Sequence, residues 1–307
     1  MLSIPSPVMH ELIDGNMAYA VEQSHAGDED EGLLKKLYAE ESPWMAQASL
    51  DAPVVYAAML VNDQGHSPTP IQWKQTTTWL RRYCRYPHEP YLDRLVAIDN
   101  AFQGKAERND LRAGRHKFLW KHGETGQESE RMPGRAKEVL LFCDVFDKAL
   151  ALHPPDVPLV KAPYYFGYAF NYIKEHRNHL ANHASSFLLQ LVRHILQVLF
   201  PGRYSLRVFP ICFTTSGRES KYAELVLSCV GDGLAYTGGG YGVHAPGLHN
   251  SSSEPAGWLA VDATRFWREK VAFRKEFGIY GKQRDHEMKL LKKGRISGRC
   301  GRNRSEN

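Results

Sequence analysis

Hydrophobic positions recur at helical spacing through the first part of the chain. In IQWKQTTTWLRRYCRY, residues 71–86, Trp73 and Trp79 lie six residues apart, as on one packed helix face. In PYLDRLVAIDNAFQG, residues 90–104, leucine and isoleucine follow one another at three-residue steps. An acidic break, GDEDEG, and an apolar run within SLDAPVVYAAMLVND lie before these two segments. We therefore predict a mainly helical region over residues 1–135. Short turns between its helices leave open either ordinary helix packing or a helix-turn-helix-like binder.

The periodicity weakens in the middle of the chain. Residues 105–135 are rich in charged residues and turn formers, and predict a loop or linker with a boundary close to Gly134. The following segment, EVLLFCDVFDKALAL at 138–152, has a period that fits either a buried strand or a short helix. HPPDVP then forces a break.

From residue 163 onward, strand-like composition becomes clear. We predict strands over YYFGYAF at 164–170 and YSLRVFPICF at 204–213, because both combine aromatic residues with other good strand formers. Gly167 marks a position where another group approaches the backbone closely.

A helix follows each predicted strand. The first helical region begins after Asn171, a candidate N-cap, and runs to about Phe200 with a bend near 184–186. The second is KYAELVLSCV, for which Ser220 is the candidate N-cap and Gly231 the terminator. The pattern predicts an α+β protein in which residues 136–262 form a small mixed α/β domain.

The next segment, YTGGGYGVHAPGLHNSSS at 236–253, is a loop rich in glycine and serine. Its backbone amides could approach a phosphate, but it lacks the GxxxxGK[ST] order of a P-loop. The GxGxxG fingerprint is also absent, which argues against a dinucleotide-cofactor fold.

Composition is that of a globular protein: the 307 residues are 43% hydrophobic and 24% charged. No apolar run reaches the roughly 18 residues of a membrane span, and the N-terminus does not resemble a secretory signal. The five cysteines are widely spaced without a CxxC pair, as expected of reduced thiols. We expect an intracellular protein without a membrane partner.

The net charge of +5 is unevenly distributed. It is −4 over residues 1–135, zero over 136–264 and +9 over 265–307. We predict a basic helix and tail over 263–307 that attracts nucleic-acid phosphates and is compatible with a nuclear address. A solubilising tail is the alternative. The candidate nucleic-acid-binding residues are Arg265, Arg268, Arg274, Lys275, Lys292 and Lys293.

Two features of the α/β region are typical of a functional site. The helix after the first strand carries Lys174, Arg177 and His179 within about three turns, although a solvated basic helix is the simpler interpretation. Glu224 stands on a largely apolar helix, where a buried carboxylate needs a partner or a metal unless the helix exposes it. A further hypothesis is a metal site on one helix face made by the imidazoles of His176, His179 and His183.

The order of a strand with a YxG motif, a helix with His, a second strand, a helix with Glu and a glycine-bearing loop resembles the GIY-YIG nuclease superfamily. The resemblance covers about residues 160–250. Tyr165, Gly167 and His179 fall on the second-motif tyrosine, its glycine and the helix histidine, and Glu224 on the metal-binding carboxylate.

The chain also departs from the family pattern. Glu175 stands where the family has arginine, with Lys174 and Arg177 nearby. No GIY triplet lies about ten residues before Tyr165, so the first strand is expected in EVLLFCDVF. The family asparagine has no clear counterpart, since Asn250 comes late.

The resemblance implies metal-dependent hydrolysis of DNA phosphodiester bonds. Glu224 would bind Mg²⁺ or Mn²⁺, and Tyr165 and His179 would activate or orient water. Arg177 or Lys174 would contact the phosphate. This assignment requires Tyr165, His179 and Glu224 to converge around one concave site. The alternative is a non-catalytic nucleic-acid-binding protein on a decayed nuclease fold. Such a protein does not need the family arginine, so this alternative accounts for Glu175 at that position.

Overall fold

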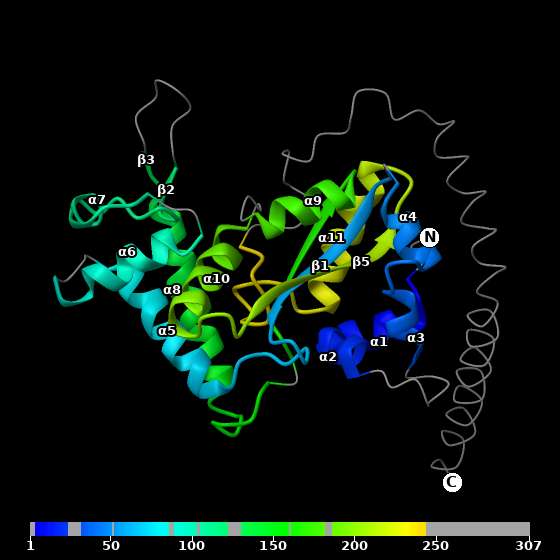
Figure 1. Ribbon diagram of the computed structural model, residues 1–307, viewed down its shortest axis with the longest axis horizontal. Helices are drawn as coiled ribbons and strands as arrows, with labels where there is room; N and C mark the ends of the chain where they lie inside the picture. Colours follow the sequence, from blue (N-terminus) through cyan, green and yellow to red (C-terminus); the bar gives the residue numbers. More distant parts are fainter. Residues whose placement is uncertain are drawn as a thin grey trace, which may run out of the picture.

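A small three-stranded antiparallel sheet lies at the centre of the molecule (Figure 1). The computed structural model describes residues 4–23, 32–50, 52–85, 89–102, 105–121, 130–159, 161–181 and 186–243. The sheet has the order β4-β1-β5, with β1 at Val54–Val61, β4 at Tyr164–Ala169 and β5 at Ser205–Phe213. The strands predicted from the YYFGYAF and YSLRVFPICF patterns are thereby confirmed.

The central strand corrects one expectation from the sequence. β1 supplies the partner of β4, whereas EVLLFCDVF belongs to the helix α8, Pro133–Leu150. All eight residues of β1 are buried, so this strand has no alternation of apolar and polar positions. Its register places Tyr56 opposite Gly167 and Ala58 opposite Tyr165.

Four short helices cover one flank of the sheet. They are α1 at Ser6–Asp14, α2 at Met17–Gln23, α3 at Gly32–Leu37 and α4 at Pro43–Ala48. The hydroxyl of Tyr38 and the indole N–H of Trp44 both donate to the carbonyl of Pro210 in β5, at 3.0 and 3.1 Å. These bonds attach the N-terminal helices to an edge strand whose Pro210 lacks an N–H of its own.

A second group of helices packs on the other side, to the left in Figure 1. It comprises α5 at Pro70–Cys84, α6 at Leu92–Asn100, α7 at Arg108–Arg112, α8 and α10 at Phe187–Leu199, with a 3-10 turn at Glu89–Tyr91. α5 packs against α8, and α10 against α5 and α6. The helices expected from the spacing of Trp73 and Trp79 and from residues 90–104 are confirmed, and both tryptophans are buried.

The segment predicted as a loop at 105–135 contains regular structure. α7 lies there, and β2 at Trp120–Lys121 pairs with β3 at Glu130–Arg131. The charged residues that indicated a linker include Arg108 and Arg112, which make ion pairs with Glu89 instead.

Two further helices follow β4 and β5 and carry the candidate site residues. α9 spans Tyr172–Leu180, and its N-cap is Asn171, whose side chain accepts from the Lys174 N–H as predicted. α11 spans Gly217–Val230 and packs beside β4 and β1. Its N-cap is Ser216 rather than Ser220, which corrects the prediction, while Gly231 terminates the helix as expected.

The described part of the chain is an α+β protein with eleven α-helices. None of its helices is long and apolar enough to cross a membrane. The four cysteines within it are free thiols. The predicted basic helix and tail at 263–307 lies outside the described residues.

Candidate functional site

The phenol of Tyr56, on the central strand, lies at the centre of a buried polar cluster. Its hydroxyl is 2.9 Å from Nε2 of His179 and donates to Oε1 of Glu175 at 3.5 Å. The same Glu175 oxygen is 3.6 Å from His179 Nε2. Because Glu175 and His179 are four residues apart on α9, they project together toward the sheet.

Tyr165 and Glu224 belong to the same neighbourhood. The Tyr165 ring centroid is 6.4 Å from that of Tyr56 and 6.1 Å from that of His179. Glu224, on α11, is 5% exposed, and its charge acts on the Tyr56 hydroxyl. Two of the three residues predicted to converge, Tyr165 and His179, therefore lie beside Tyr56, and the charge of the buried Glu224 acts on the same hydroxyl.

Gly167 permits this arrangement. A Cβ atom at this position would lie 2.5 Å from the Tyr56 hydroxyl oxygen and 2.7 Å from its Cζ atom. The ring of Tyr56 thus crosses the backbone of β4 at the one residue without a side chain. The glycine that the sequence marked as a close approach accommodates the phenol at the centre of the cluster.

Burial sets the protonation of the central pair. Desolvation raises the pKa of Tyr56 well above its ordinary value, and electrostatic interactions with Tyr165, Glu175 and Glu224 raise it further. Desolvation also lowers the pKa of His179 to about 4, with smaller effects of His176 and Arg193. At neutral pH the phenol is therefore protonated and the imidazole neutral.

The hydrogen bonds favour one direction of donation. If Nε2–H of His179 donates to Tyr56, the phenol is free to donate to Glu175, and each proton has an acceptor. The opposite tautomer would place a proton on Nδ1 of His179, which is buried without a hydrogen-bond partner. We infer the first arrangement, in which a chain of two hydrogen bonds ends on a carboxylate.

The predicted phosphate-binding cations lie on a different face of α9. Lys174 and Arg177 are exposed and line a cavity of about 500 Å³, whose other lining residues are Ser49, Asn171, Ile173 and Asn178. Asn178 connects the two faces, since its amide donates to Oε2 of Glu175 at 3.3 Å. One bridging residue therefore joins a basic cavity to the buried cluster.

The donor atoms of the cluster are chemically suited to a hard cation. Glu224 and Glu175 offer carboxylate oxygens, the ligands that Mg²⁺ and Mn²⁺ prefer, and one or two carboxylates suffice for Mg²⁺. Across the described residues no group of three or more His, Cys, Asp or Glu side chains is placed to hold a metal. The histidine hypothesis gains no support there: His176 stacks on Tyr172, His179 faces Tyr56, and His183 lies outside the described residues.

Two members of the cluster were not identified as site residues from the sequence. Tyr56 is separated from His179 by 123 residues, so no local motif joins them. Glu175 was noted only as a departure from the family pattern, although its spacing of four from His179 was a usable signal. The six candidate nucleic-acid-binding residues from Arg265 to Lys293 lie outside the described residues.

Comparison with known proteins adds no assignment. No protein-family model, curated protein or solved structure matches this chain. Its function must therefore be argued from the cluster around Tyr56 and from the surfaces near it.

Proposed function

We propose that this protein is a metal-dependent phosphodiesterase of the GIY-YIG type that cleaves DNA. The observation that carries the proposal is the position of Tyr165 and His179 beside Tyr56, on whose hydroxyl the charge of Glu224 also acts. These side chains come from two strands and two helices that are far apart in the sequence. A cluster of titratable groups with shifted pKa values is a common feature of catalytic sites.

The order of elements supports the same proposal. The strand with the YFG motif pairs antiparallel with a strand that contains Val54, Val55 and Tyr56, and the helices bearing His179 and Glu224 follow β4 and β5. VVY thus supplies a tyrosine on the strand beside the YFG motif, although the resemblance expects a GIY triplet about ten residues before Tyr165. The helices α5 to α8 separate the two strands in the sequence without separating them in the sheet.

The residues of the cluster can divide the chemistry among them. Glu224 would hold the Mg²⁺ or Mn²⁺ ion, which would stabilise negative charge on the phosphate as a Lewis acid. The neutral imidazole of His179 and the phenol of Tyr56 can orient a water molecule and move its proton toward Glu175. Lys174 and Arg177, which line the cavity on the other face of α9, would contact the phosphate backbone of the substrate beside the cluster.

Glu224→Ala tests the proposal directly. Branched, single-stranded and duplex DNA are incubated with the purified full chain and Mg²⁺, and again with a chelator. We expect cleavage that the chelator stops and that Glu224→Ala lowers by at least about a hundredfold, since the variant lacks the proposed metal ligand.

Glu219→Ala is the matched control on the same helix. Glu219 accepts from the N–H and hydroxyl of Thr215 near the start of α11, so its loss should weaken the helix without removing the metal. Cleavage in this variant should persist at a temperature where it remains folded. Full activity of folded Glu224→Ala would end the assignment.

A second candidate function is nucleic-acid binding without cleavage. It is favoured by the enclosure of the cluster, because Tyr165 is 7% exposed, Glu224 5% and His179 0%. Glu175 also places a carboxylate where the resemblance expects arginine, and its contact with Tyr56 and His179 gives it a structural role. Binding that weakens steeply with salt, with no cleavage of any DNA form in Mg²⁺ or Mn²⁺, would select this function.

A further inference from the structure

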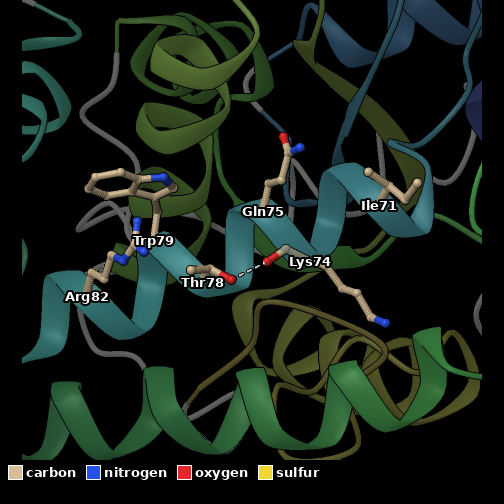
Figure 2. A pocket seen from close by; sticks show the side chains of 6 residues that line it. All are labelled: Ile71, Lys74, Gln75, Thr78, Trp79 and Arg82. Carbon is tan, nitrogen blue, oxygen red and sulfur yellow. Dashed lines mark hydrogen bonds between the residues drawn. The ribbon is translucent and has the colours of Figure 1, made fainter.

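A basic groove runs along α5, in the helical group between β1 and β4. Figure 2 shows the six side chains that line it, with Ile71 toward one end and Arg82 beside the Trp79 ring at the other. The lining residues follow the three- and four-residue steps of one helix face, and the cavity measures about 360 Å³. They are Ile71, Lys74, Gln75, Thr78, Trp79 and Arg82.

The positive charge of this groove is not compensated. Within the part of the chain that the structure describes, Lys74, Arg82 and the nearby Arg94 have no carboxylate at ion-pair distance. Arg81, on the same helix, instead pairs with Asp144 and Asp147 of α8, at 2.8 and 2.5 Å. Arg81 offsets part of the negative charge of Asp144 and Asp147, and the cations of the groove make no ion pair with either carboxylate, so they remain available to an anionic ligand.

Arg82 is held in place by aromatic rings. Its Cζ atom lies 4.8 Å from the ring centroid of Trp79 and 4.4 Å from that of Tyr91. Arg94 lies 5.1 Å from the same Trp79 ring. Such stacking restrains a guanidinium while leaving its N–H groups available, which lowers the entropic cost of binding a phosphate.

The groove suits a phosphate backbone better than exposed bases. A base would stack on an open aromatic face, but Trp79 is only 7% exposed and carries two arginines. Lys74 and Arg82 are eight residues apart, about 12 Å along the helix axis, which equals the axial rise of roughly three to four base pairs in a duplex. The polar groups of Gln75 and Thr78 lie between them.

We propose that the α5 groove binds the phosphate backbone of double-stranded DNA and holds it without reading its sequence. This inference rests on the proposed function in taking DNA as the substrate, and it adds a binding surface outside the Tyr56 cluster. Lys74 and Arg82 would each contact a phosphate, and Arg94 would reinforce the positive potential beside Trp79.

The test is the affinity of the full chain for a duplex of about 20 base pairs and for one of its single strands, measured by fluorescence anisotropy in a chelator so that no cleavage intervenes. The variant is Lys74→Gln with Arg82→Gln, and its folding is checked by circular dichroism. We expect its dissociation constant to rise about tenfold or more at low salt. The slope of log affinity against log salt should fall by about 2, one unit for each lost phosphate contact.

The matched control removes two exposed lysines from α3, as Lys35→Gln with Lys36→Gln. It makes the same change in net charge on the opposite side of the sheet (Figure 1). We expect its affinity and salt slope to equal those of the wild type. Equal weakening in both double variants would overturn the proposal, because net charge alone would then govern binding.

Two other outcomes would also overturn the groove assignment. One is an unchanged affinity and salt slope in Lys74→Gln with Arg82→Gln; the other is a defect confined to single-stranded DNA.

The failure of the phosphodiesterase proposal is distinguishable from these outcomes. If the wild type cleaves nothing but the groove variant binds duplex DNA poorly, the groove stands and hydrolysis fails. If cleavage depends on Glu224 but the groove variant binds normally, hydrolysis stands and the groove fails.

Discussion

At the scale of single residues, the cluster depends on which side chains are absent as well as on which are present. Tyr56 reaches His179 and Glu175 only because Gly167, its partner in the register of β1 and β4, leaves room for the ring. The sequence predicts the strand and a close approach of another group to Gly167. It does not identify that group, because Tyr56 is paired with Gly167 only in the sheet.

Gly167→Ala should therefore destabilise the protein. The added methyl group would overlap the Tyr56 phenol, and we expect a loss of about 1–3 kcal/mol in the free energy of unfolding, measured by chemical denaturation. Gly134→Ala is the control, because nothing lies within 4 Å of a Cβ there and the residue is in the first turn of α8. The control should be neutral or more stable by up to about 1 kcal/mol. Equal stabilities of the two variants would contradict the close packing of Tyr56 on β4.

Only part of the candidate site can be predicted from the sequence. Tyr165, His179 and Glu224 are predicted from their match to the pattern of the GIY-YIG family, and their catalytic roles stay predictions. Tyr56 could not be predicted, since it lies in an unbroken apolar run and meets His179 only through sheet pairing over 123 positions. The phosphate-contacting role of Lys174 and Arg177 stays a prediction, and the structure adds that both line a cavity on the outer side of α9.

At the scale of elements, helices and strands are predicted best where the residue pattern of the element and a boundary signal such as an N-cap agree. β4, β5 and the Asn171 cap were found because aromatic strands and a capping side chain stand side by side in the sequence. β1 was missed because a strand buried on both faces has no alternation. The short apolar run EVLLFCDVF is compatible with a strand, but it is part of a longer segment that forms the helix α8.

The start of α11 offers a test at this scale. Ser216 caps the helix by accepting from the Glu219 N–H at 3.2 Å, whereas Ser220 lies inside it and bonds to Thr214 and to the Ser216 carbonyl. Ser216→Ala should lower the free energy of unfolding by about 1 kcal/mol, since one N–H of the first turn loses its acceptor. Ser216→Asp should restore most of that stability, because its carboxylate can accept the same bond and favours the positive end of the helix dipole. Thermal denaturation of the three proteins measures both effects, and an aspartate variant less stable than the alanine variant would refute the capping role.

At the scale of the whole molecule, one sheet connects two sets of helices that the sequence presents as separate regions. β1 comes from the region before Gly134 and β4 and β5 from the region after it, so the candidate site draws on both. The helices between β1 and β4 then form a group that carries the basic α5 groove. A DNA molecule held by that group and cleaved at the Tyr56 cluster would contact both parts of a continuous body.

Two buried titratable groups of the helical part, His194 and Asp99, have opposite effects on the free energy of unfolding as the pH falls. His194, on α10, has a pKa lowered to about 4, chiefly by burial, and its Nδ1 atom lies 2.6 Å from the Ile98 carbonyl. Its contribution to stability is complete above its unfolded value near 6.5 and is lost as the pH falls toward 4. Asp99, which follows Ile98 in α6, has a pKa raised to about 6 by burial. Its contribution has the opposite sign: it is complete below the unfolded value near 3.9 and is lost as the pH rises through 6.

Replacing each group separately should change the pH dependence of stability in opposite directions. His194→Asn can keep a donor to the Ile98 carbonyl but cannot be protonated, so between pH 7 and pH 4 it should lose less stability than the wild type, by about 3 kcal/mol. Asp99→Asn cannot be protonated, so acid does not stabilise it, and over the same range it should lose more stability than the wild type, by about 2 kcal/mol. It will also be less stable than the wild type at pH 7, because the Tyr83 hydroxyl and the Lys117 N–H donate to different carboxylate oxygens and the amide has an acceptor at only one of these positions. Urea denaturation at pH 7, 5.5 and 4 measures the slopes, and parallel slopes for the two variants would show that these two side chains do not titrate as their burial requires.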